Sequence, residues 1–130
     1  MIKITKEPIS IEAVLDSTQD KNAGGYVYFI GTIRQENAIE GIEYQSYLPL
    51  AQKQMENVVG EAKNKWALQK VSVVHRVGLV PVGHAAVVIA VCSVHRKEAF
   101  AACEFIIDRI KEIVPIWKEG GAACCHHHQS

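Results

Sequence analysis

Two lysines near the end of the chain stand where an amine can do chemistry. Lys111 falls in the last turn of an apolar-faced helix, and Lys118 ends the segment Pro115-Ile116-Trp117-Lys118. A proline ends a helix at or before the preceding residue, because its ring clashes backward and it has no N–H to donate. The chain therefore turns between the two amines, and both can face one cleft. A lysine beside tryptophan and isoleucine loses part of its water, which lowers its pKa toward general-base or nucleophilic use.

Three further basic stretches stand at expected strand ends or helix starts. Arg34 closes a β-rich segment, His75-Arg76 ends another, and His95 and Arg96 come directly before a long helix. Donors at a helix N-terminus join the backbone N–H groups in binding anions. Concentrated at such junctions in a chain of net charge zero, these cations predict a pocket for an anion. The structural alternatives stay open: His95 as a helix cap, Arg96 paired with a nearby carboxylate, and both lysines solvated.

Length and composition indicate one globular domain. The chain has 130 residues, of which 48% are hydrophobic and 22% charged, so it can bury a sizeable core. The balanced charge gives no support to a nucleic-acid or membrane-surface role. No apolar run approaches the roughly 20 residues that span a bilayer, and no signal peptide precedes the first strand. We therefore expect a cytoplasmic protein, with Cys92 and Cys103 as buried thiols.

The hydrophobic pattern alternates strands with helices. Strands are expected at 2–6, 26–34, 42–47, 71–76 and 85–94, and helices at 10–15, 49–66 and 97–113. The almost wholly apolar run 85–94 predicts a central strand. In segment 26–34, period two places Val27, Phe29 and Ile33 on one side. No repeat, linker or boundary divides residues 1–119, so the fold class is a mixed α/β (α+β) single domain.

The end of the chain gathers two cysteines and three histidines. Residues 120–130 read Gly-Gly-Ala-Ala-Cys-Cys-His-His-His-Gln-Ser. Zinc sites use ligands separated by about two to four residues on elements that fix a tetrahedron. Contiguous ligands behind a small-residue spacer instead predict a flexible C-terminal tail with adventitious metal affinity. We expect no metal site, and a metal-handling function fails if deletion of residues 122–130 leaves the function intact.

Five motifs in register resemble the large, catalytic subunit of molybdopterin synthase. They run in order between about residue 5 and residue 119, and they comprise Phe29–Arg34, Tyr44–Tyr47, His75–Gly78, Ser93–Phe100 and Lys111–Lys118. Each motif alone is short, and the five together are specific.

This resemblance implies both a fold and a reaction. The fold is an α/β hammerhead with an added antiparallel β subdomain, over residues 1–119. The reaction belongs to molybdenum cofactor biosynthesis and installs two sulfurs in a cyclic pyranopterin monophosphate, forming the dithiolene of molybdopterin. Sulfur arrives as the C-terminal thiocarboxylate of a small ubiquitin-like carrier subunit that ends in Gly-Gly. Two large subunits form a central homodimer within a heterotetramer, and no metal or organic cofactor is required.

Motif by motif, the resemblance also implies the roles of the basic residues. Lys111 and Lys118 match the catalytic lysines, while Arg34, His95 and Arg96 match the side chains that bind the substrate. An alternative from a different class is a non-catalytic dimeric module that binds an anion or a peptide tail in the same pocket. Replacing Lys118 with Arg separates the two, since the charge is kept while a proton-transfer or covalent role is lost.

Overall fold

Strands and helices alternate along the chain, as the hydrophobic pattern predicts. A computed structural model describes residues 1–36 and 38–119; the predicted tail, 120–130, lies outside them. The elements are β1 (Ile2–Thr5), α1 (Ile11–Asp16), β2 (Gly25–Thr32), β3 (Gly41–Ser46), α2 (Leu48–Lys65), β4 (Lys70–Arg76), β5 (Gly78–Pro81), β6 (Ala85–Ser93), α3 (Arg96–Ile113) and β7 (Ile116–Lys118).

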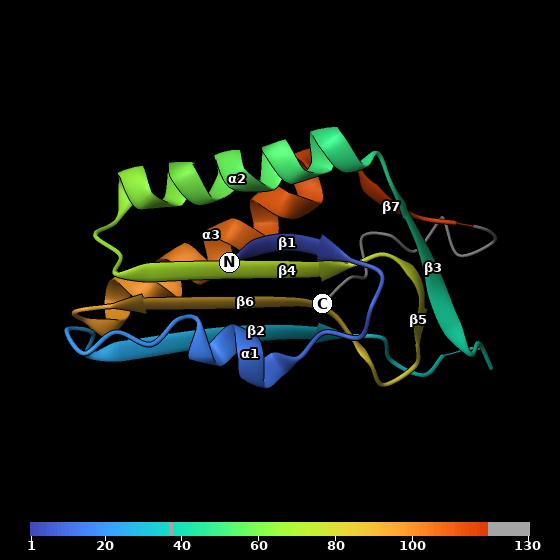
Figure 1. Cartoon of the computed structure of the whole chain (residues 1–130), viewed down its shortest axis with the longest axis horizontal. Coiled ribbons are helices and arrows are strands. Elements are labelled where there is room, and N and C mark those ends of the chain that lie inside the picture. The colour runs from blue at the N-terminus through green and yellow to red at the C-terminus, as the bar shows by residue number, and fades with distance from the viewer. Residues whose placement is uncertain (37, 120–130) are drawn as a thin grey trace.

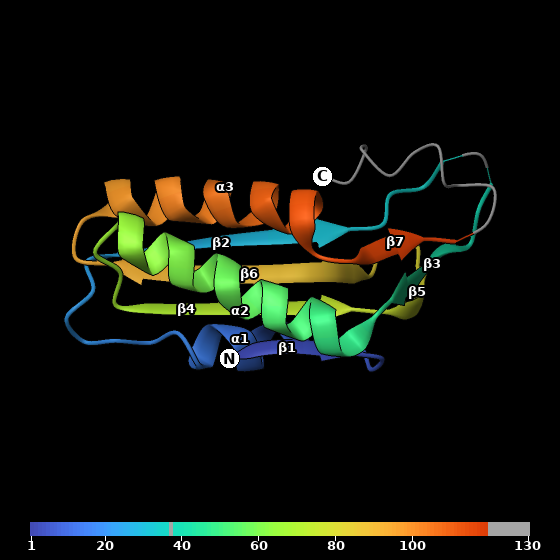
Figure 2. The same cartoon turned by 90° about the horizontal axis from the view of Figure 1, so that it is seen from above.

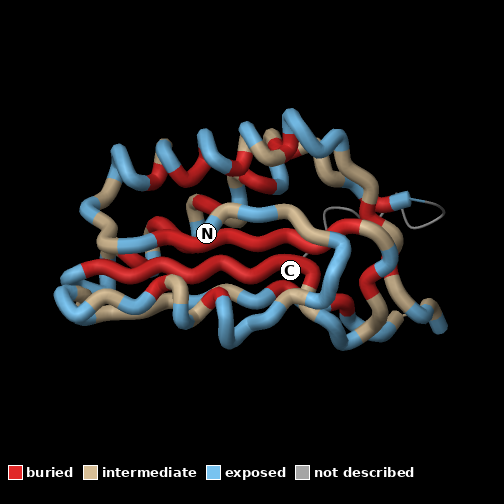
Figure 3. The backbone as a smooth tube through the Cα atoms, viewed as in Figure 1, coloured by how far each residue is buried: buried red, intermediate tan, exposed pale blue. Residues whose placement is uncertain are grey.

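The larger sheet has the strand order β1-β4-β6-β2. β1 runs parallel to β4, and the other neighbours are antiparallel. The two central strands, β4 and β6, form the most continuously buried part of the chain (Figure 3). The prediction that 85–94 is a central strand is therefore confirmed, and the reason is that both faces of β6 are covered.

Helices α2 and α3 cover one face of this sheet, and α1 lies on the other (Figures 1 and 2). The α3 helix buries Ala99, Cys103, Ile106 and Ile110 at helical spacing, so they form one face. In α2, Leu50 is exposed and Ala51 is buried. Ala51 lies four residues before the buried Met55, whereas Leu50 falls one position off this helical stripe.

Ser10 caps the short helix α1. The Ser10 hydroxyl accepts a hydrogen bond from the Ala13 N–H at 3.2 Å, which satisfies one of the free donors of the first turn. Val14 then packs on Val74, Val88 and Ala90 of the larger sheet. Among the helices within the described ranges, none is both long and apolar enough to cross a membrane.

A smaller sheet of order β5-β3-β7 stands at the end of the larger one (Figure 1). Its core includes Ile42, Val80 and Ile33. Placing Ile33 on the same side as Val27 and Phe29 was wrong, because the pairing of β2 with β6 shifts register between Gly31 and Thr32. This irregularity turns Ile33 into the second core. Strands β5 and β7 were not predicted.

The prediction that two cysteines are buried thiols is confirmed. Cys92 and Cys103 are free and buried. Burial raises the pKa of the Cys103 thiol to about 11 and is also the main cause that raises the pKa of Cys92. Both side chains therefore act as small apolar groups of the core.

Candidate active site

The turn after α3 holds Lys118 in a defined place. The helix ends where the Val114 N–H donates to the Ile110 carbonyl at 3.1 Å, directly before Pro115. The next three residues form β7, which pairs antiparallel with β3 so that Lys118 stands opposite Tyr44. Backbone hydrogen bonds flank this strand on both sides, from Tyr47 N–H to the Pro115 carbonyl and from Glu119 N–H to the Glu43 carbonyl. The backbone that carries Lys118 is thus fixed by pairing.

The Lys118 side chain is buried, with 8% of its surface exposed. Its neighbour Trp117 is 47% exposed, and successive side chains of a strand point to opposite faces. The predicted desolvation by Trp117 is therefore not the cause of the burial. Tyr44, which is 3% exposed, lies on the same face as Lys118.

Lys111 is brought close to Lys118, as the turn at Pro115 predicts. Lys111 is exposed in the last turn of α3, and loss of water to neighbouring protein atoms is the main cause that lowers its pKa. The charge of Asp108 raises this pKa, and the charge of Lys118 lowers it again. Because the two ammonium groups repel each other, one of them gives up a proton more readily than an isolated lysine does.

A buried histidine lies behind Tyr44. The ring of His75 meets the ring of Tyr44 edge to face, with centroids 5.5 Å apart and an interplanar angle of 74°. Burial lowers the pKa of His75 to about 4, although its hydrogen bond to the Arg76 carbonyl raises it. His75 is therefore neutral near pH 7. Sequence reasoning missed Tyr44 as part of the site, although period two in 42–47 places it on the face of Ile42. It took His75 for a cation of the anion pocket, which is wrong because burial keeps this ring neutral.

Arg34 lies at the same end of the molecule as the lysines. It follows Ile33, which packs in the core of the smaller sheet with Tyr44 and Ile116. The Arg34 side chain is 65% exposed and forms a 3.4 Å ion pair with Glu36. A surface ion pair of this kind contributes little to stability, so the guanidinium can exchange Glu36 for an anionic ligand.

His95 and Arg96 lie at the opposite end of α3. A rise of about 1.5 Å per residue separates Arg96 from Lys111 by about 22 Å along the helix. The structure therefore brings Lys111 and Lys118 together and places Arg34 next to the core that contains Tyr44. It does not bring His95 and Arg96 to the lysines within one chain.

The start of α3 borders an open hollow of about 660 Å³ lined by Gly24, Val94, His95, Arg96, Lys97 and Phe100. His95 occupies the cap position, yet its side chain makes no capping hydrogen bond, so the helix-cap alternative does not hold. Gly25 permits the close approach of this segment, because a Cβ there would lie 2.9 Å from the Cα of Arg96. The exposed cations in this lining, together with the free N–H groups at the start of α3, favour the binding of an anion here.

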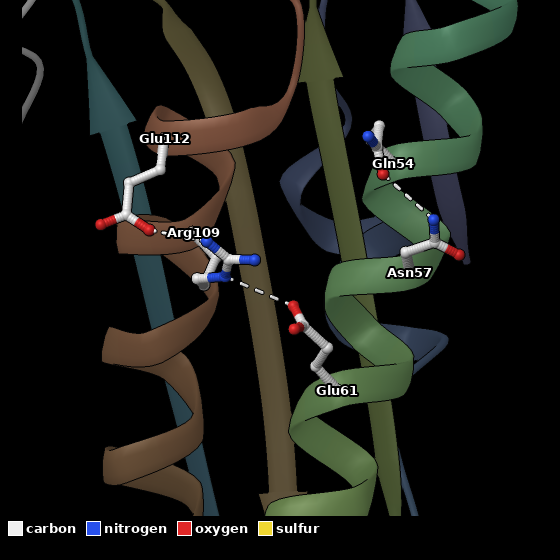
Figure 4. A network of polar contacts seen from close by, with 5 residues as sticks. All are labelled: Gln54, Asn57, Glu61, Arg109 and Glu112. Carbon is white, nitrogen blue, oxygen red and sulfur yellow. Dashed lines mark hydrogen bonds and ion pairs between the residues drawn. The ribbon is translucent and has the colours of Figure 1, made fainter.

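The lysine-bearing end of α3 is tied to α2 by Arg109. Its guanidinium reaches Glu61 of α2 at 3.3 Å and Glu112 of its own helix at 2.9 Å (Figure 4). These pairs lie on the surface and add little free energy. They do join the two helices within one turn of Lys111.

The side chains in the described ranges include no group of three or more His, Cys, Asp or Glu arranged to hold a metal ion. The Cys and His residues of the predicted tail lie outside these ranges.

Comparison with known proteins assigns the family. The family model described as "MoaE protein" matches residues 4–113. The chain belongs to the MoaE family. It is 41% identical over 120 residues to the molybdopterin synthase catalytic subunit of Bacillus subtilis, an alignment that covers 90% of this chain and 76% of the relative.

Solved structures of MoaE proteins share the fold. Molybdopterin synthase from Staphylococcus aureus superposes with a TM-score of 0.84 at 42% identity, covering 88% of this chain and 86% of that one. A complex of subunits 1 and 2 of the molybdopterin-converting factor from Helicobacter pylori gives a TM-score of 0.79 at 26% identity, with coverages of 90% and 82%. The predicted family and the mixed fold with two sheets are confirmed.

Proposed function

We propose that this chain is the catalytic subunit of a molybdopterin synthase, which moves sulfur from a carrier thiocarboxylate to a cyclic pyranopterin monophosphate. The observation that carries the proposal is the lysine pair in a MoaE fold: a buried Lys118 beside Lys111, whose pKa is lowered. Dithiolene formation needs proton transfer at the opening ring, and a lysine with a lowered pKa suits that task. Arg34, which follows Ile33 of the core shared with Tyr44, supplies a charge-assisted donor for an anionic group.

A direct test uses the purified chain, a synthetic or recombinant carrier with a C-terminal thiocarboxylate, and cyclic pyranopterin monophosphate. With at least two equivalents of the carrier for each pterin, one for each sulfur, we expect molybdopterin to form and the carriers to be left as carboxylates. The matched control is the same carrier ending in an ordinary carboxylate, which has no sulfur to give and must yield no product. Binding of both partners without product from the thiocarboxylate carrier would favour the non-catalytic binding module instead.

We further propose that each active site uses two copies of the chain. His95 and Arg96 lie about 22 Å along α3 from Lys111, too far for one small substrate to reach both groups of one molecule. A second copy of the chain can place its own His95 and Arg96 beside the lysines of the first copy, so that one substrate contacts both groups. The exposed apolar side chains Val94 and Phe100 beside these cations support a contact surface there. The expected assembly is the homodimer at the centre of a heterotetramer.

The sulfur donor that we propose is a small ubiquitin-like subunit ending in Gly-Gly. The Helicobacter pylori relative is known as a complex of two subunits of this system. A thiocarboxylate must reach the lysines between segment 113–118 and the loop after Arg34, and glycine passes such a channel because it has no Cβ. A synthetic peptide ending in Gly-Gly should therefore bind, and a bulky residue in place of the last glycine should abolish binding. Equal binding of both peptides would refute the channel.

The compartment that we propose is the cytoplasm. Two buried free thiols, Cys92 and Cys103, suit a reducing compartment. Fractionation of cells that produce the tagged chain tests this placement, and recovery in an oxidising extracytoplasmic fraction would contradict it.

A further inference from the structure

A row of three buried side chains joins the two sheets at the active site. Lys118 on β7 stands directly opposite Tyr44 on β3, and Tyr44 packs edge to face against His75 on β4. None of the three is more than 8% exposed. The row therefore runs from the larger sheet, through the aromatic ring of Tyr44, to the lysine that we propose to be catalytic.

The inner end of this row is a neutral histidine of fixed orientation. Nδ1 of His75 lies 2.8 Å from the carbonyl oxygen of Arg76. A carbonyl oxygen only accepts, so Nδ1 carries the proton and donates, and Nε2 is left without one. Burial lowers the pKa of His75 to about 4, which keeps the ring neutral near pH 7.

The carboxylate next to Tyr44 on β3 points away from this row. Glu43 precedes Tyr44 in the strand, and the alternation of side chains turns its carboxylate to the opposite face. Arg76 likewise points to the opposite face of β4 from His75. On the β3 side Lys118 thus stands opposite an aromatic ring, with the cation of Lys111 beside it.

We propose that Tyr44 and His75 are positioning residues for Lys118: His75 fixes the ring of Tyr44, and that ring holds the lysine side chain in its reactive place. The proposal rests on the proposed function, in which Lys118 takes part in sulfur transfer. An aromatic ring suits that role, since a carboxylate in the same place would favour the charged ammonium and oppose its use as a proton acceptor. A ring against the lysine stem also limits where the amine can move.

The test compares two aromatic pairs of the same geometry. Trp66 and Phe105 also meet edge to face, at 5.4 Å and 69°, on the helix side of the molecule. We expect Tyr44→Leu and Phe105→Leu to lower the unfolding temperature by similar amounts, since each loses one ring contact. Only Tyr44→Leu should slow single-turnover sulfur transfer, by about tenfold, because misplacing a reacting group by a fraction of an ångström is costly.

Three readouts separate positioning from simple destabilisation. The KM for the pterin should stay within about threefold while the transfer rate falls, and the pH profile of the transfer step should move in Tyr44→Leu alone. Tyr44→Phe keeps the ring and should restore both the rate and the profile. If Tyr44→Leu does not fold, His75→Leu takes its place and should slow transfer by about threefold, since it only loosens the Tyr44 ring.

The outcomes also distinguish this inference from the proposed function. If Lys118→Ala abolishes transfer while Tyr44→Leu transfers sulfur at the rate and pH profile of Phe105→Leu, the positioning role is overturned and the function stands. If Lys118→Ala transfers sulfur normally, the proposed function of that lysine fails first, and the positioning role fails with it.

Discussion

The two ends of α3 carry cations in opposite settings. At its C-terminal end Lys118 is buried behind Tyr44, and Lys111 has a lowered pKa. At its N-terminal end His95 and Arg96 are exposed beside an open hollow and the free N–H groups of the helix. Loss of water lowers the pKa of an ammonium and so favours proton transfer, whereas an exposed guanidinium keeps its charge and can bind an anion. On the roles that we propose, one helix thus separates a reactive end from a binding end.

The largest effect is expected for Lys118→Ala at the reactive end. Loss of a positioned proton-transfer group slows the chemical step by about 10²- to 10⁴-fold, and substrate affinity should change by a few-fold at most. Single-turnover sulfur transfer with a thiocarboxylate carrier measures the rate. Lys63→Ala, at an exposed position in the last turn of α2, is the control. Normal turnover by Lys118→Ala would show that the C-terminal end of α3 does not supply the proton-transfer group.

A second expected difference concerns acid stability. The pKa of His75 falls from 6.5 to about 4 on folding, so the unfolded chain takes up this proton first as the pH drops. The stability that comes from keeping His75 neutral is therefore fully present above pH 6.5 and is lost as the pH falls toward 4. The free energy of unfolding changes by about 3 kcal/mol over this range. Urea unfolding of the wild type and of His75→Gln at pH 7 and pH 4 measures it. The variant should lose this part of the pH dependence, whereas His95→Gln at the exposed end should keep it.

Removing Arg96 should weaken binding without slowing chemistry. A charge-assisted hydrogen bond contributes about 1.5–3 kcal/mol, so Arg96→Ala should raise the KM for the pterin by about 10- to 100-fold. The transfer rate at saturating substrate should stay within about threefold of the wild type. The matched control is Lys97→Ala, the next cation of the same helix turn. If the transfer rate at saturating substrate falls while KM stays unchanged, Arg96 takes part in the chemical step and does not merely bind the substrate.

The smallest effect is expected from mixing two variants. This experiment tests directly whether one site takes residues from two copies of the chain. If each site takes its lysines from one copy and its Arg96 from the other, a mixed dimer of Lys118→Ala and Arg96→Ala chains holds one intact site. Unfolding and refolding equal amounts together should restore about a quarter of the wild-type rate at low substrate, since half of the random dimers are mixed. Each variant refolded alone is the baseline. A mixture no better than this baseline would mean that the two ends of α3 never share a site.

Long elements were predictable from the sequence, and short ones were not. The run 85–94 and the helix face from Ala99 to Ile110 carry enough periodic apolar residues to define β6 and α3. Strand β7 has three residues and β5 has four, too few for a period to show. Strands β5 and β7 form because β3 lies between them and pairs with each. This pairing joins residues that are far apart in the sequence, so no local pattern predicts it.

The residues of the site were recognisable, but their surroundings were not. The turn at Pro115 was enough to predict that Lys111 and Lys118 meet. The burial of Lys118 was assigned to its sequence neighbour Trp117, whereas Tyr44 lies against it from 74 positions earlier in the chain. The separation of Arg96 from Lys111 follows from helix length alone, and treating all five basic residues as one pocket overlooked it.

The place of β1 in the larger sheet has a consequence for how the chain is made. Its partner β4 begins at Lys70, and the pairing joins Ile2 to Val73, 71 positions later. At about 5–20 residues per second, a ribosome needs about 4–14 s to supply that partner after the first strand is synthesised. Contacts of such long sequence separation also form late, because the loop between them must first close. We therefore expect the newborn N-terminus to remain unprotected until β4 has emerged, and pulse-labelling of its amides on stalled chains would show the moment at which it docks.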